Sequence, residues 1–419
     1  MKVLHLSTFD DKRGAAIATK RLHEALIAKD VDSWILCDLP TGNTPNSIGL
    51  RNKPNWLRDR LRGRLRKHIV ALQNDPDSYY LSLNRRHNTL LDRIDALKPD
   101  IVHMHWVGKD FLHIEDLPTL CARYPVVWTL HDMWPFCGAE HFAYKDDRWC
   151  NGYTKQNRSP QARGIDFNRW VWQRKLKAWT SCTIHTISVS NWMNHCVSSS
   201  KLFQGIKGVR KVIHNGIDTN IFNPPDTLEK ALIDDLEKGK RRPKIVCMST
   251  PLTNKIKGIE LFIEAMHHLH ACNMKFDITT FGGPPLPNLP ALGSIEHMGH
   301  ISNPIELAKL YASADLLVTA SRMESFGQTA AEALACGTPV VCFDTSGLRD
   351  IVQHKQNGYR AEYFSPKSLA DGIAWCLQDI DHYRSLQSQA RASVAEKFNV
   401  DRIVKETTDF YAHILVSHA

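Results

Sequence analysis

One stretch of the chain, residues 314–344, strongly limits the folds open to it: ADLLVTASRMESFGQTAAEALACGTPVVCFD. Its apolar run Asp315–Thr319 is typical of a buried parallel strand, and Gln328–Cys336 is made largely of strong helix formers. Gly337 follows where a helix would end, and residues 339–343 form a second apolar run. Strand, loop, helix and strand in this order indicate an α/β fold with a parallel sheet.

The loop between the first strand and the helix carries polar groups suited to a ligand. Ligands of open α/β sheets lie off the carboxyl ends of the strands, where helix N-termini offer N–H groups to anions. This loop places there Glu324, Ser325, the amides of Phe326 and Gly327, and the first helical residue, Gln328, with Glu332 about one turn further on. Two carboxylates beside amides suit a ligand that carries both hydroxyls and phosphate.

The same residues carry a family resemblance. Glu324-Ser325-Phe326-Gly327, with Glu332 after seven intervening residues, resembles the E-x7-E signature of the retaining GT-B glycosyltransferases of group 1, family 4. The run from Ala335 to Val341 matches the rest of that motif. The resemblance implies two doubly wound Rossmann-like domains that face a cleft, with the acceptor mainly on the first and a nucleotide sugar mainly on the second.

The length of 419 residues is enough for two domains. Asn215-Gly216 is a turn signal and resembles the family's domain boundary. We therefore expect an N-terminal domain over residues 1–215, a nucleotide-sugar domain over 216–400, and a final helix over 401–419 that packs back on the first domain.

Two segments of the N-terminal half resemble functional loops of the family. Gly14-Ala15 lies at the first strand-to-helix turn and resembles a glycine loop near the donor diphosphate, although Arg13 stands where the family often has glycine. His131-Asp132 follows an apolar strand and resembles surface-polysaccharide enzymes of the family, in which a histidine lies near the transferred sugar. As catalytic candidates, His131 could hydrogen-bond a sugar hydroxyl, and Asp132 could accept from the acceptor or hold the loop. Capping and loop packing are the alternative for both.

The C-terminal half contains the basic residues that the resemblance requires. Lys257-Gly258 matches the family's Lys-Gly, which would neutralise the leaving diphosphate. The family's earlier arginine is absent, and Lys255 is the expected replacement. Gly282-Gly283 resembles the glycine-rich loop beside the donor. In this interpretation Glu332 accepts hydrogen bonds from the ribose and Glu324 from the sugar.

A basic amphipathic helix is predicted over residues 54–72, interrupted by Gly63. Apolar residues recur at helical spacing among arginines, as in helices that lie on anionic membranes. The residues expected at the membrane are Trp56, Arg60, Leu61, Arg64 and Leu65. A helix packed on its own domain with a solvated basic face is an equal alternative, and a nucleic-acid arm lacks an accompanying motif.

Composition narrows the partners and the location. The formal charge of +9 favours an anionic partner, and eleven cysteines without a framework fit a reducing compartment. Without a signal peptide or a long apolar run, the chain is expected in the cytoplasm, at most peripheral on the inner face of the membrane. Cys137, His141 and Cys150 have irregular spacing for zinc, so neither a metal nor another cofactor is expected.

These features together predict a retaining, metal-independent glycosyltransferase. It would move a sugar from a nucleoside-diphosphate sugar to a glycan or lipid-linked acceptor, in bacterial polysaccharide or lipopolysaccharide synthesis. Two alternatives stay open: another GT-B sugar enzyme, such as an epimerase or phosphorylase, and a non-enzymatic membrane-associated scaffold. The donor sugar, its base, the acceptor and the oligomeric state are not indicated by the sequence.

Overall fold

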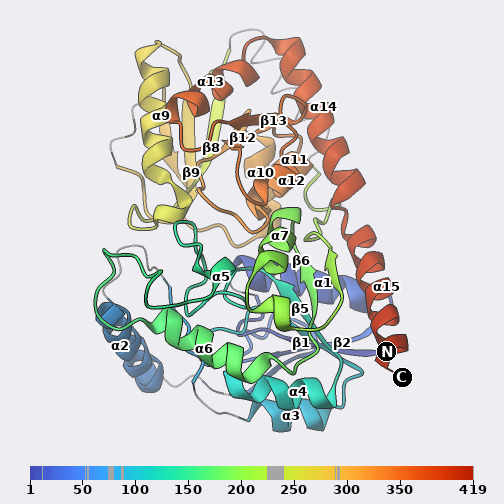
Figure 1. Ribbon diagram of the computed structural model, residues 1–419. Helices are drawn as coiled ribbons and strands as arrows, with labels where there is room; N and C mark the ends of the chain where they lie inside the picture. Colours follow the sequence, from blue (N-terminus) through green and yellow to red (C-terminus); the bar gives the residue numbers. More distant parts are fainter. Residues whose placement is uncertain are drawn as a thin grey trace. The chain divides into compact units, whose positions relative to one another are not determined.

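The computed structural model describes residues 1–11, 13–51, 53, 56–73, 80–85, 89–223, 240–287, 289 and 293–418, except for the side chains of residues 56, 58, 59, 66, 67 and 70. The chain forms two compact units (Figure 1). Unit 1 consists of Met1–His214 and Ile403–Ala419, and unit 2 of Asn215–Arg402. The functional roles expected of the two halves stay predictions.

Unit 1 is built on a seven-stranded parallel sheet with the order β3-β2-β1-β4-β5-β6-β7. The strands are β1 (Lys2–Leu6), β2 (Asp32–Cys37), β3 (Ser47–Gly49), β4 (Ile101–Met104), β5 (Val126–Leu130), β6 (His185–Ser188) and β7 (Arg210–Val212). The α-helices are α1 (Gly14–Ile27), α2 (Trp56–Gln73), α3 (Leu90–Leu97), α4 (Leu117–Arg123), α5 (Arg148–Asn151), α6 (Phe167–Trp179) and α7 (Asn191–Ser199). Leu4 of β1 pairs with Trp34 on one side and Val102 on the other.

Unit 2 is built on a six-stranded parallel sheet with the order β10-β9-β8-β11-β12-β13. The strands are β8 (Lys244–Ser249), β9 (Asp277–Gly282), β10 (Ile295–His297), β11 (Leu316–Thr319), β12 (Val340–Phe343) and β13 (Gly358–Ala361). The α-helices are α9 (Ile259–Ala271), α10 (Pro304–Ala312), α11 (Gln328–Ala335), α12 (Leu348–Ile351), α13 (Pro366–Cys376) and α14 (Ile380–Lys397), followed by α15 (Val400–His418), most of which belongs to unit 1.

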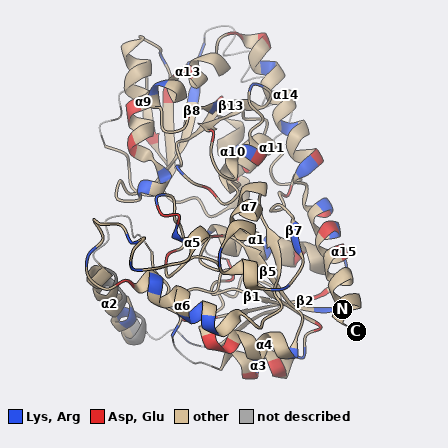
Figure 2. Cartoon of the chain, viewed as in Figure 1, with Lys and Arg blue, Asp and Glu red and all other residues tan. Residues whose placement is uncertain are grey.

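The central strands of both sheets are largely buried because helices cover both faces, whereas the edge strands β7 and β10 are not. Every residue of β4, β5 and β12 is buried. In unit 2, side chains of β8, β11 and β12 pack against α9 and α13, with Phe262 and Ile373 among the fully buried residues. Most charged residues accordingly lie on helices and loops (Figure 2). In both units, residues that bind ligands can therefore lie on the loops at the carboxyl ends of the strands, outside the packed core.

The basic helix differs from its prediction in one respect. It is continuous from Trp56 to Gln73, so Gly63 does not interrupt it. A single glycine costs a helix only about 1 kcal/mol relative to alanine, which the flanking leucines and arginines offset. The connecting helix and loop expected over residues 227–242 lie almost wholly outside the described residues.

The last helix is tied to the core of unit 1. The Tyr411 hydroxyl lies 2.5 Å from Nδ1 of His103 in β4, and both residues are fully buried. Lys211 of β7 lies over the ring of Phe410. Residues from Ile403 onward therefore belong to the same unit as the sheet whose first strand begins at Lys2. Among the described helices, none is long and apolar enough to span a membrane.

Candidate functional site

The E-x7-E loop lies at the carboxyl end of β11 in unit 2, beside the loop that follows β8. Lys257 Nζ lies 2.5 Å from Glu324 Oε1, and the Ser321 hydroxyl donates to the same oxygen at 2.8 Å. The Lys257 and Glu324 side chains are 25% and 18% exposed, so water can reach both. This ion pair holds together two residues that are 67 positions apart in the chain, and a ligand could exchange with either.

Backbone contacts hold Glu324 in place. Its N–H donates to the Ser346 hydroxyl at 2.8 Å, and its carbonyl accepts from Gly347 N–H at 2.9 Å. Gly327 has φ of 108° and starts α11, and a Cβ there would lie 2.8 Å from Leu348. Only glycine fits this backbone and this space without strain. The first turn of α11 therefore begins close to the carboxyl end of β11, and its N–H groups without a partner inside the helix lie at that end.

Glu332 lies inside α11 and is 3% exposed. Its carboxylate accepts from the Tyr311 hydroxyl at 3.3 Å and lies 3.5 Å from Gln328 Nε2. Gln328 in turn lies 3.4 Å from Asn215 Nδ2. Both contacts are longer than an optimal hydrogen bond.

The lysine loop contains one well-placed cation and one exposed cation. Gly258 has φ of 60°, and a Cβ at this position would lie only 2.0 Å from the Ala320 carbonyl oxygen. Glycine therefore allows the Lys257 loop to approach the end of β11 closely. Lys255 is 51% exposed and lies 3.8 Å from Glu260. Arg322 reaches the same loop and donates to the Lys255 carbonyl at 2.5 Å and to Glu260 at 2.8 Å. Sequence reasoning missed Arg322, whose position two residues before Glu324 was the available signal.

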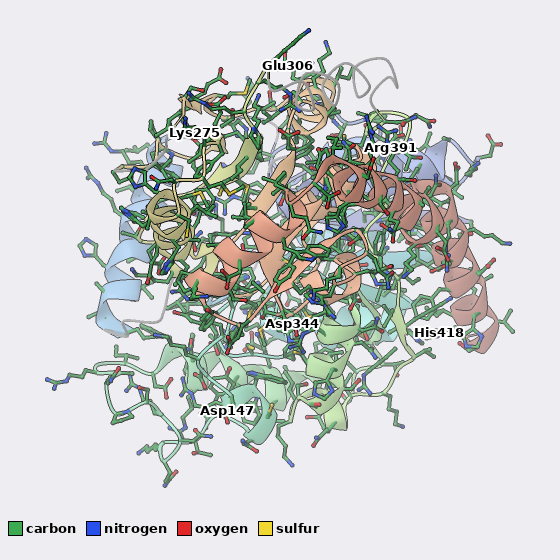
Figure 3. The ribbon with its side chains drawn as sticks, turned by 90° about the horizontal axis from the view of Figure 1, so that it is seen from above. Asp147, Lys275, Glu306, Asp344, Arg391 and His418 are labelled. Carbon is green, nitrogen blue, oxygen red and sulfur yellow. The ribbon has the colours of Figure 1, made fainter. Side chains whose placement is uncertain are left out.

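The other residues of unit 2 that were predicted for the donor are Ser325, Phe326, Gly282 and Gly283. Ser325 and Phe326 are buried, and the Phe326 ring packs edge-on against Phe398 at 5.5 Å. Gly282 ends β9, and Gly283 N–H donates to the Ser249 carbonyl at 2.9 Å. Asp344, labelled in Figure 3, follows β12 and pairs with Arg349 and Arg360 at 3.0 and 3.1 Å.

In unit 1, His131 stands at the end of a hydrogen-bonded chain of histidines. His131 Nε2 lies 3.1 Å from Nδ1 of His105, whose Nε2 lies 2.9 Å from Nδ1 of His5. Burial lowers the pKa of His131 to about 4 and that of His105 well below its usual range. Neutral rings can form such a chain because each donates one N–H and accepts one. With Nε2 engaged, Nδ1 is the nitrogen that His131 can offer to a ligand.

Asp132 accepts from donors on three sides. Its Oδ2 accepts from Trp106 Nε1 at 2.7 Å and lies 2.5 Å from His141 Nδ1, and its Oδ1 accepts from Trp134 N–H at 3.0 Å. It is 6% exposed. This arrangement favours the alternative in which Asp132 holds the loop that presents His131.

Both ring nitrogens of His141 have hydrogen-bond partners, so neither is available as a zinc ligand. Nε2 lies 2.8 Å from the Ser82 hydroxyl, and Nδ1 lies 2.5 Å from Asp132. Within the described residues, the group close enough to hold an ion is instead His5, His103 and His105. Both nitrogens of His103 are in hydrogen bonds, to Tyr411 and Thr129, and both of His105 join the histidine chain. Protein contacts thus occupy both nitrogens of His103 and of His105, whereas His5 uses only Nδ1 and its Nε2 has no hydrogen-bond partner among the described residues.

The first strand-to-helix turn has an unusual backbone. Gly14 begins α1, and the Ala15 carbonyl accepts from Thr19 at 2.8 Å. Arg13, which caps the helix, has φ of 80° and ψ of 157°. That region is populated almost only by glycine, which is a physical reason for the glycine that the resembled family often has there.

Helix α2 exposes a stripe of leucines. Leu57, Leu61, Leu65 and Leu72 are 58, 55, 61 and 54% exposed. At about 100° per residue these positions lie within about 80° of one another around the helix. Arg60 and Arg64 are exposed beside the stripe, and the Trp56 side chain lies outside the described ones. The stripe has the form of a membrane-binding face, and membrane contact stays a prediction.

Comparison with known proteins covers both units. The family model of Glycosyltransferase Family 4 matches residues 12–221, about half of the chain, and that of Glycosyl transferases group 1 matches residues 242–379. An uncharacterized glycosyltransferase of Methanocaldococcus jannaschii is 29% identical over 327 residues, which make up 75% of each chain.

Two further likenesses have narrower meaning. A D-inositol 3-phosphate glycosyltransferase of Xylanimonas cellulosilytica is 30% identical over 217 residues, 48% of this chain and half (50%) of that protein. The crystal structure of Anabaena Alr3699/HepE in complex with UDP-glucose matches with a TM-score of 0.64 and 18% identity, covering 99% of this chain and 100% of that one. The second likeness concerns the fold alone.

Proposed function

This chain is a group 1 glycosyltransferase of family 4 with a GT-B fold, and from that premise we propose a finer function. It transfers a sugar, with retention of anomeric configuration, from a nucleoside-diphosphate sugar to a glycan or lipid-linked acceptor in bacterial polysaccharide or lipopolysaccharide synthesis. The observation that carries the proposal is the Lys257–Glu324 pair at the strand ends of unit 2, beside the glycine turn that opens α11.

The donor phosphates would be bound by Lys257 and by the amides of Phe326 and Gly327. As the bond from the sugar to the diphosphate breaks, negative charge grows on the leaving oxygen, and donors already aimed there stabilise it. Lys257 would then exchange its contact with Glu324 for the phosphate. Lys255 and Arg322 are the second cations available at this loop. Because these groups supply the positive charge, we propose that transfer needs no divalent metal.

The hydroxyl groups of the donor would be bound by the two glutamates. Glu324, released from Lys257, accepts from the sugar hydroxyls, and Glu332 accepts from the two ribose hydroxyls. His131 would contact the sugar through Nδ1, since His105 holds its other nitrogen. We propose a nucleoside-diphosphate hexose as the class of donor; the Anabaena protein, which is similar to this chain in fold, is named in complex with UDP-glucose.

Thermal stabilisation by nucleotides tests the donor site. UDP, GDP, ADP and their glucose conjugates are added to the wild type and to Glu332→Gln, which keeps the volume but removes the charge. A ligand present at 100 times its Kd stabilises the protein by about 2.7 kcal/mol. We expect one base to raise the melting temperature of the wild type and to do so much less in the variant. If no nucleotide shifts either protein, the scaffold alternative replaces the enzyme.

Product analysis tests the reaction. With the donor so identified, NMR of the product gives its anomeric configuration, and activity after chelation of divalent metals tests the metal independence. An inverted product or a chelator-sensitive rate would contradict the respective part of the proposal. A donor that is isomerised, or released as free sugar phosphate without an acceptor, would favour an epimerase or a phosphorylase.

We propose that α2 lies on the inner face of the cytoplasmic membrane, supported by its exposed leucines. Sedimentation with anionic vesicles compares the wild type with Leu61→Ser/Leu65→Ser and with Arg60→Glu/Arg64→Glu. Each Leu→Ser change removes apolar area that would be buried in the bilayer. Each arginine near an anionic surface contributes about 1 kcal/mol to membrane binding. Both double variants should bind at least tenfold more weakly. Equal sedimentation of all three proteins would remove the membrane from the proposal.

A further inference from the structure

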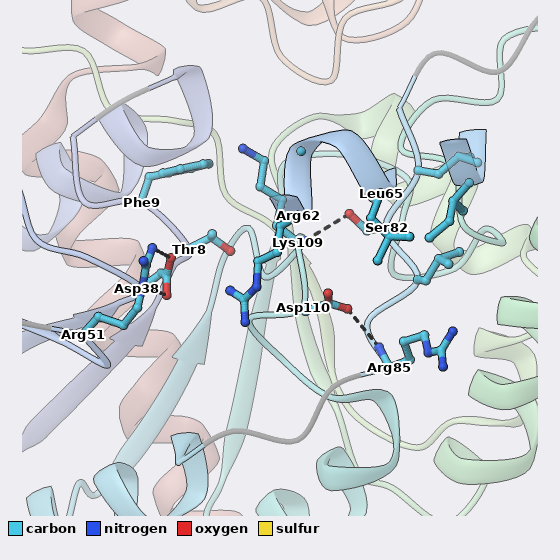
Figure 4. Close-up of a pocket in the computed structure, with 14 residues that line it drawn as sticks. Thr8, Phe9, Asp38, Arg51, Arg62, Leu65, Ser82, Arg85, Lys109 and Asp110 are labelled. Carbon is cyan, nitrogen blue, oxygen red and sulfur yellow. Dashed lines mark hydrogen bonds and ion pairs between the residues drawn. The ribbon is translucent and has the colours of Figure 1, made fainter. Parts of the chain in front are cut away.

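Unit 1 contains a cavity of about 560 Å³ (Figure 4). This volume is in the range of small-molecule sites. Its walls come from the loop after β1, from Asp38 and Arg51, from helix α2, and from the segments around residues 81–85 and 109–110. The donor-side residues of unit 2 take no part in it. The sequence did not indicate this cavity, because its lining residues are far apart in the chain.

The wall of the cavity is rich in positive charge. Arg51, Arg62, Arg85 and Lys109 line it, against two carboxylates. Asp38 is paired with Arg51 at 2.5 Å, and Asp110 accepts from the backbone N–H of Arg85 at 3.1 Å. Four cations and two anions leave an excess of two positive charges. An anion entering the cavity would therefore meet an attractive field.

Phe9 gathers cations at the same wall. Lys109 Nζ lies 4.7 Å from the centre of its ring, and the Arg13 guanidinium lies 5.3 Å from it. The opposite contact is Trp106, whose ring stacks on Phe9 at 5.7 Å. Phe9, a residue of the cavity wall, thus holds both cations beside the cavity.

The backbone of Arg13 is an independent sign of function. Its φ of 80° and ψ of 157° are costly for any residue with a side chain. Glycine would adopt them without strain, yet the chain places a guanidinium here, beside Phe9. Arg13 does not itself line the cavity, but its guanidinium lies over Phe9, which does. A strained backbone that brings a charged group beside the cavity wall is a sign of a binding role.

The cavity also has an apolar part. Leu65 and Ile69 of α2 and Leu81 and Leu83 of the following segment face the cavity. Leu65 is also one of the exposed leucines of the α2 stripe. The same helix thus provides a wall of the cavity and the surface proposed to lie on a membrane. A ligand with a charged head and an apolar tail matches both kinds of lining.

We propose that this cavity binds the phosphate head group and the first part of the hydrocarbon chain of a lipid-phosphate acceptor. Lys109, Arg85 and Arg13 would bind the phosphate, and Leu65 and Ile69 would contact the chain. The inference rests on the proposed transfer to a lipid-linked acceptor and specifies its chemical class. Phosphate could also reach the cavity as a soluble phosphate ester, so the test separates these two sources.

Binding measured without any donor nucleotide provides the test. Farnesyl phosphate, farnesol and inorganic phosphate are titrated into the full chain, followed by calorimetry and by the fluorescence of Trp106 and its neighbours. We expect farnesyl phosphate to bind at least tenfold more tightly than farnesol or inorganic phosphate. Equal affinity for farnesol would remove the anion site. Equal affinity for inorganic phosphate would replace the lipid with a soluble phosphate and overturn the proposal.

Variants locate the binding. Lys109→Met should weaken the binding of farnesyl phosphate at least tenfold. If that variant does not fold, Arg85→Met serves the same purpose. Arg13→Gly should weaken binding several-fold without lowering the melting temperature, because glycine relieves the backbone strain. Lys177→Met, an exposed lysine of α6, is the matched control and should bind as the wild type does. Unchanged binding in Lys109→Met and Arg85→Met would overturn the assignment of this cavity.

The nucleotide measurements keep this inference distinct from the proposed function. If nucleotides stabilise the chain through Glu332 but farnesyl phosphate does not bind, the proposed lipid acceptor is contradicted and the proposed transferase is supported. If farnesyl phosphate binds through Lys109 but no nucleotide does, the cavity stands and the proposed donor reaction falls.

Discussion

The two units place their polar residues in opposite ways. In unit 2, the Lys257–Glu324 pair is partly exposed on loops at the strand ends, above a core that is almost wholly apolar. In unit 1, the histidine chain and Lys175 are buried inside the fold and surrounded by hydrogen-bond partners. Exposed charges can change partners when a ligand arrives, whereas buried ones cannot without a large cost. We infer that unit 2 supplies exchangeable charges and that unit 1 supplies rigid positioning.

The largest effect on this comparison is expected from Lys175→Met. Lys175 Nζ donates to the carbonyls of Trp134, Cys137 and Gly138, and lies 3.7 Å over the Trp134 ring. Methionine fills the space but leaves three buried carbonyls without a donor, so unfolding free energy should fall by about 3–5 kcal/mol. Denaturant unfolding measures it. Lys177→Met, on the exposed side of the same helix, should stay within about 0.5 kcal/mol. Similar losses in both variants would contradict a structural role for the buried lysine.

In unit 2, Lys257→Met should instead lower turnover with little effect on stability. Removing one preoriented donor to the leaving group costs about 10²–10³-fold in rate. Initial rates of transfer measure the effect, and the melting temperature is the control. Lys255→Met, at a more exposed position, should cost less than about tenfold. A loss in stability that accounts for the lost rate would show that the unit 2 lysine is structural, as in unit 1.

The buried histidines predict that unit 1 is the acid-sensitive unit. Burial lowers the pKa of His103 to about 3 and that of His131 to about 4. In the unfolded chain the pKa of a histidine is about 6.5. Below that pH these histidines bind protons in the unfolded chain but stay neutral in the folded chain. Stability is therefore complete above about pH 6.5 and is lost as the pH falls toward 4, by up to about 1.4 kcal/mol per pH unit for each histidine.

Unfolding free energies at pH 7 and pH 5 measure this loss, and hydrogen exchange assigns it to a unit. His131→Gln should reduce the slope by the share of one proton. An equal free energy at both pH values, or a loss that begins in unit 2, would contradict the contrast between the units.

The smallest effect is expected where the last helix meets the sheet. Tyr411→Phe removes the hydroxyl that lies 2.5 Å from His103 Nδ1, inside the core of unit 1. One buried ring nitrogen then loses its partner, which costs about 1–2 kcal/mol. Thermal unfolding compares it with Tyr363→Phe, a tyrosine of unit 2 that is 46% exposed and should change little. Equal effects would show that burial of the partner does not matter.

Features that depend on neighbours in the chain could be predicted from the sequence. The strand–loop–helix–strand order around Glu324 follows from local periodicity, and the helix end at Gly337 from its conformational freedom. The basic helix was also predicted, except for the interruption at Gly63, because a lone glycine weakens a helix without ending it.

Features that depend on distant residues could not be predicted. Neither the contact of His5 with His105 nor that of Ser82 with His141 has a signal in spacing, because each joins residues at least 59 positions apart. Lys175 belongs to a segment rich in Arg and Lys, which on sequence alone resembles a solvated surface. Only the parallel order of the strands brings these side chains into one core.

The bond between Tyr411 and His103 has a consequence for biosynthesis. On the ribosome, the strands of unit 1 emerge first, but the residues that complete its core come after all of unit 2. Unit 2 can close as soon as its own residues are out, whereas unit 1 must wait for a partner 308 positions later. The nascent first half thus lacks part of its core until after unit 2 has been made, which exposes it to the misfolding that chaperones prevent.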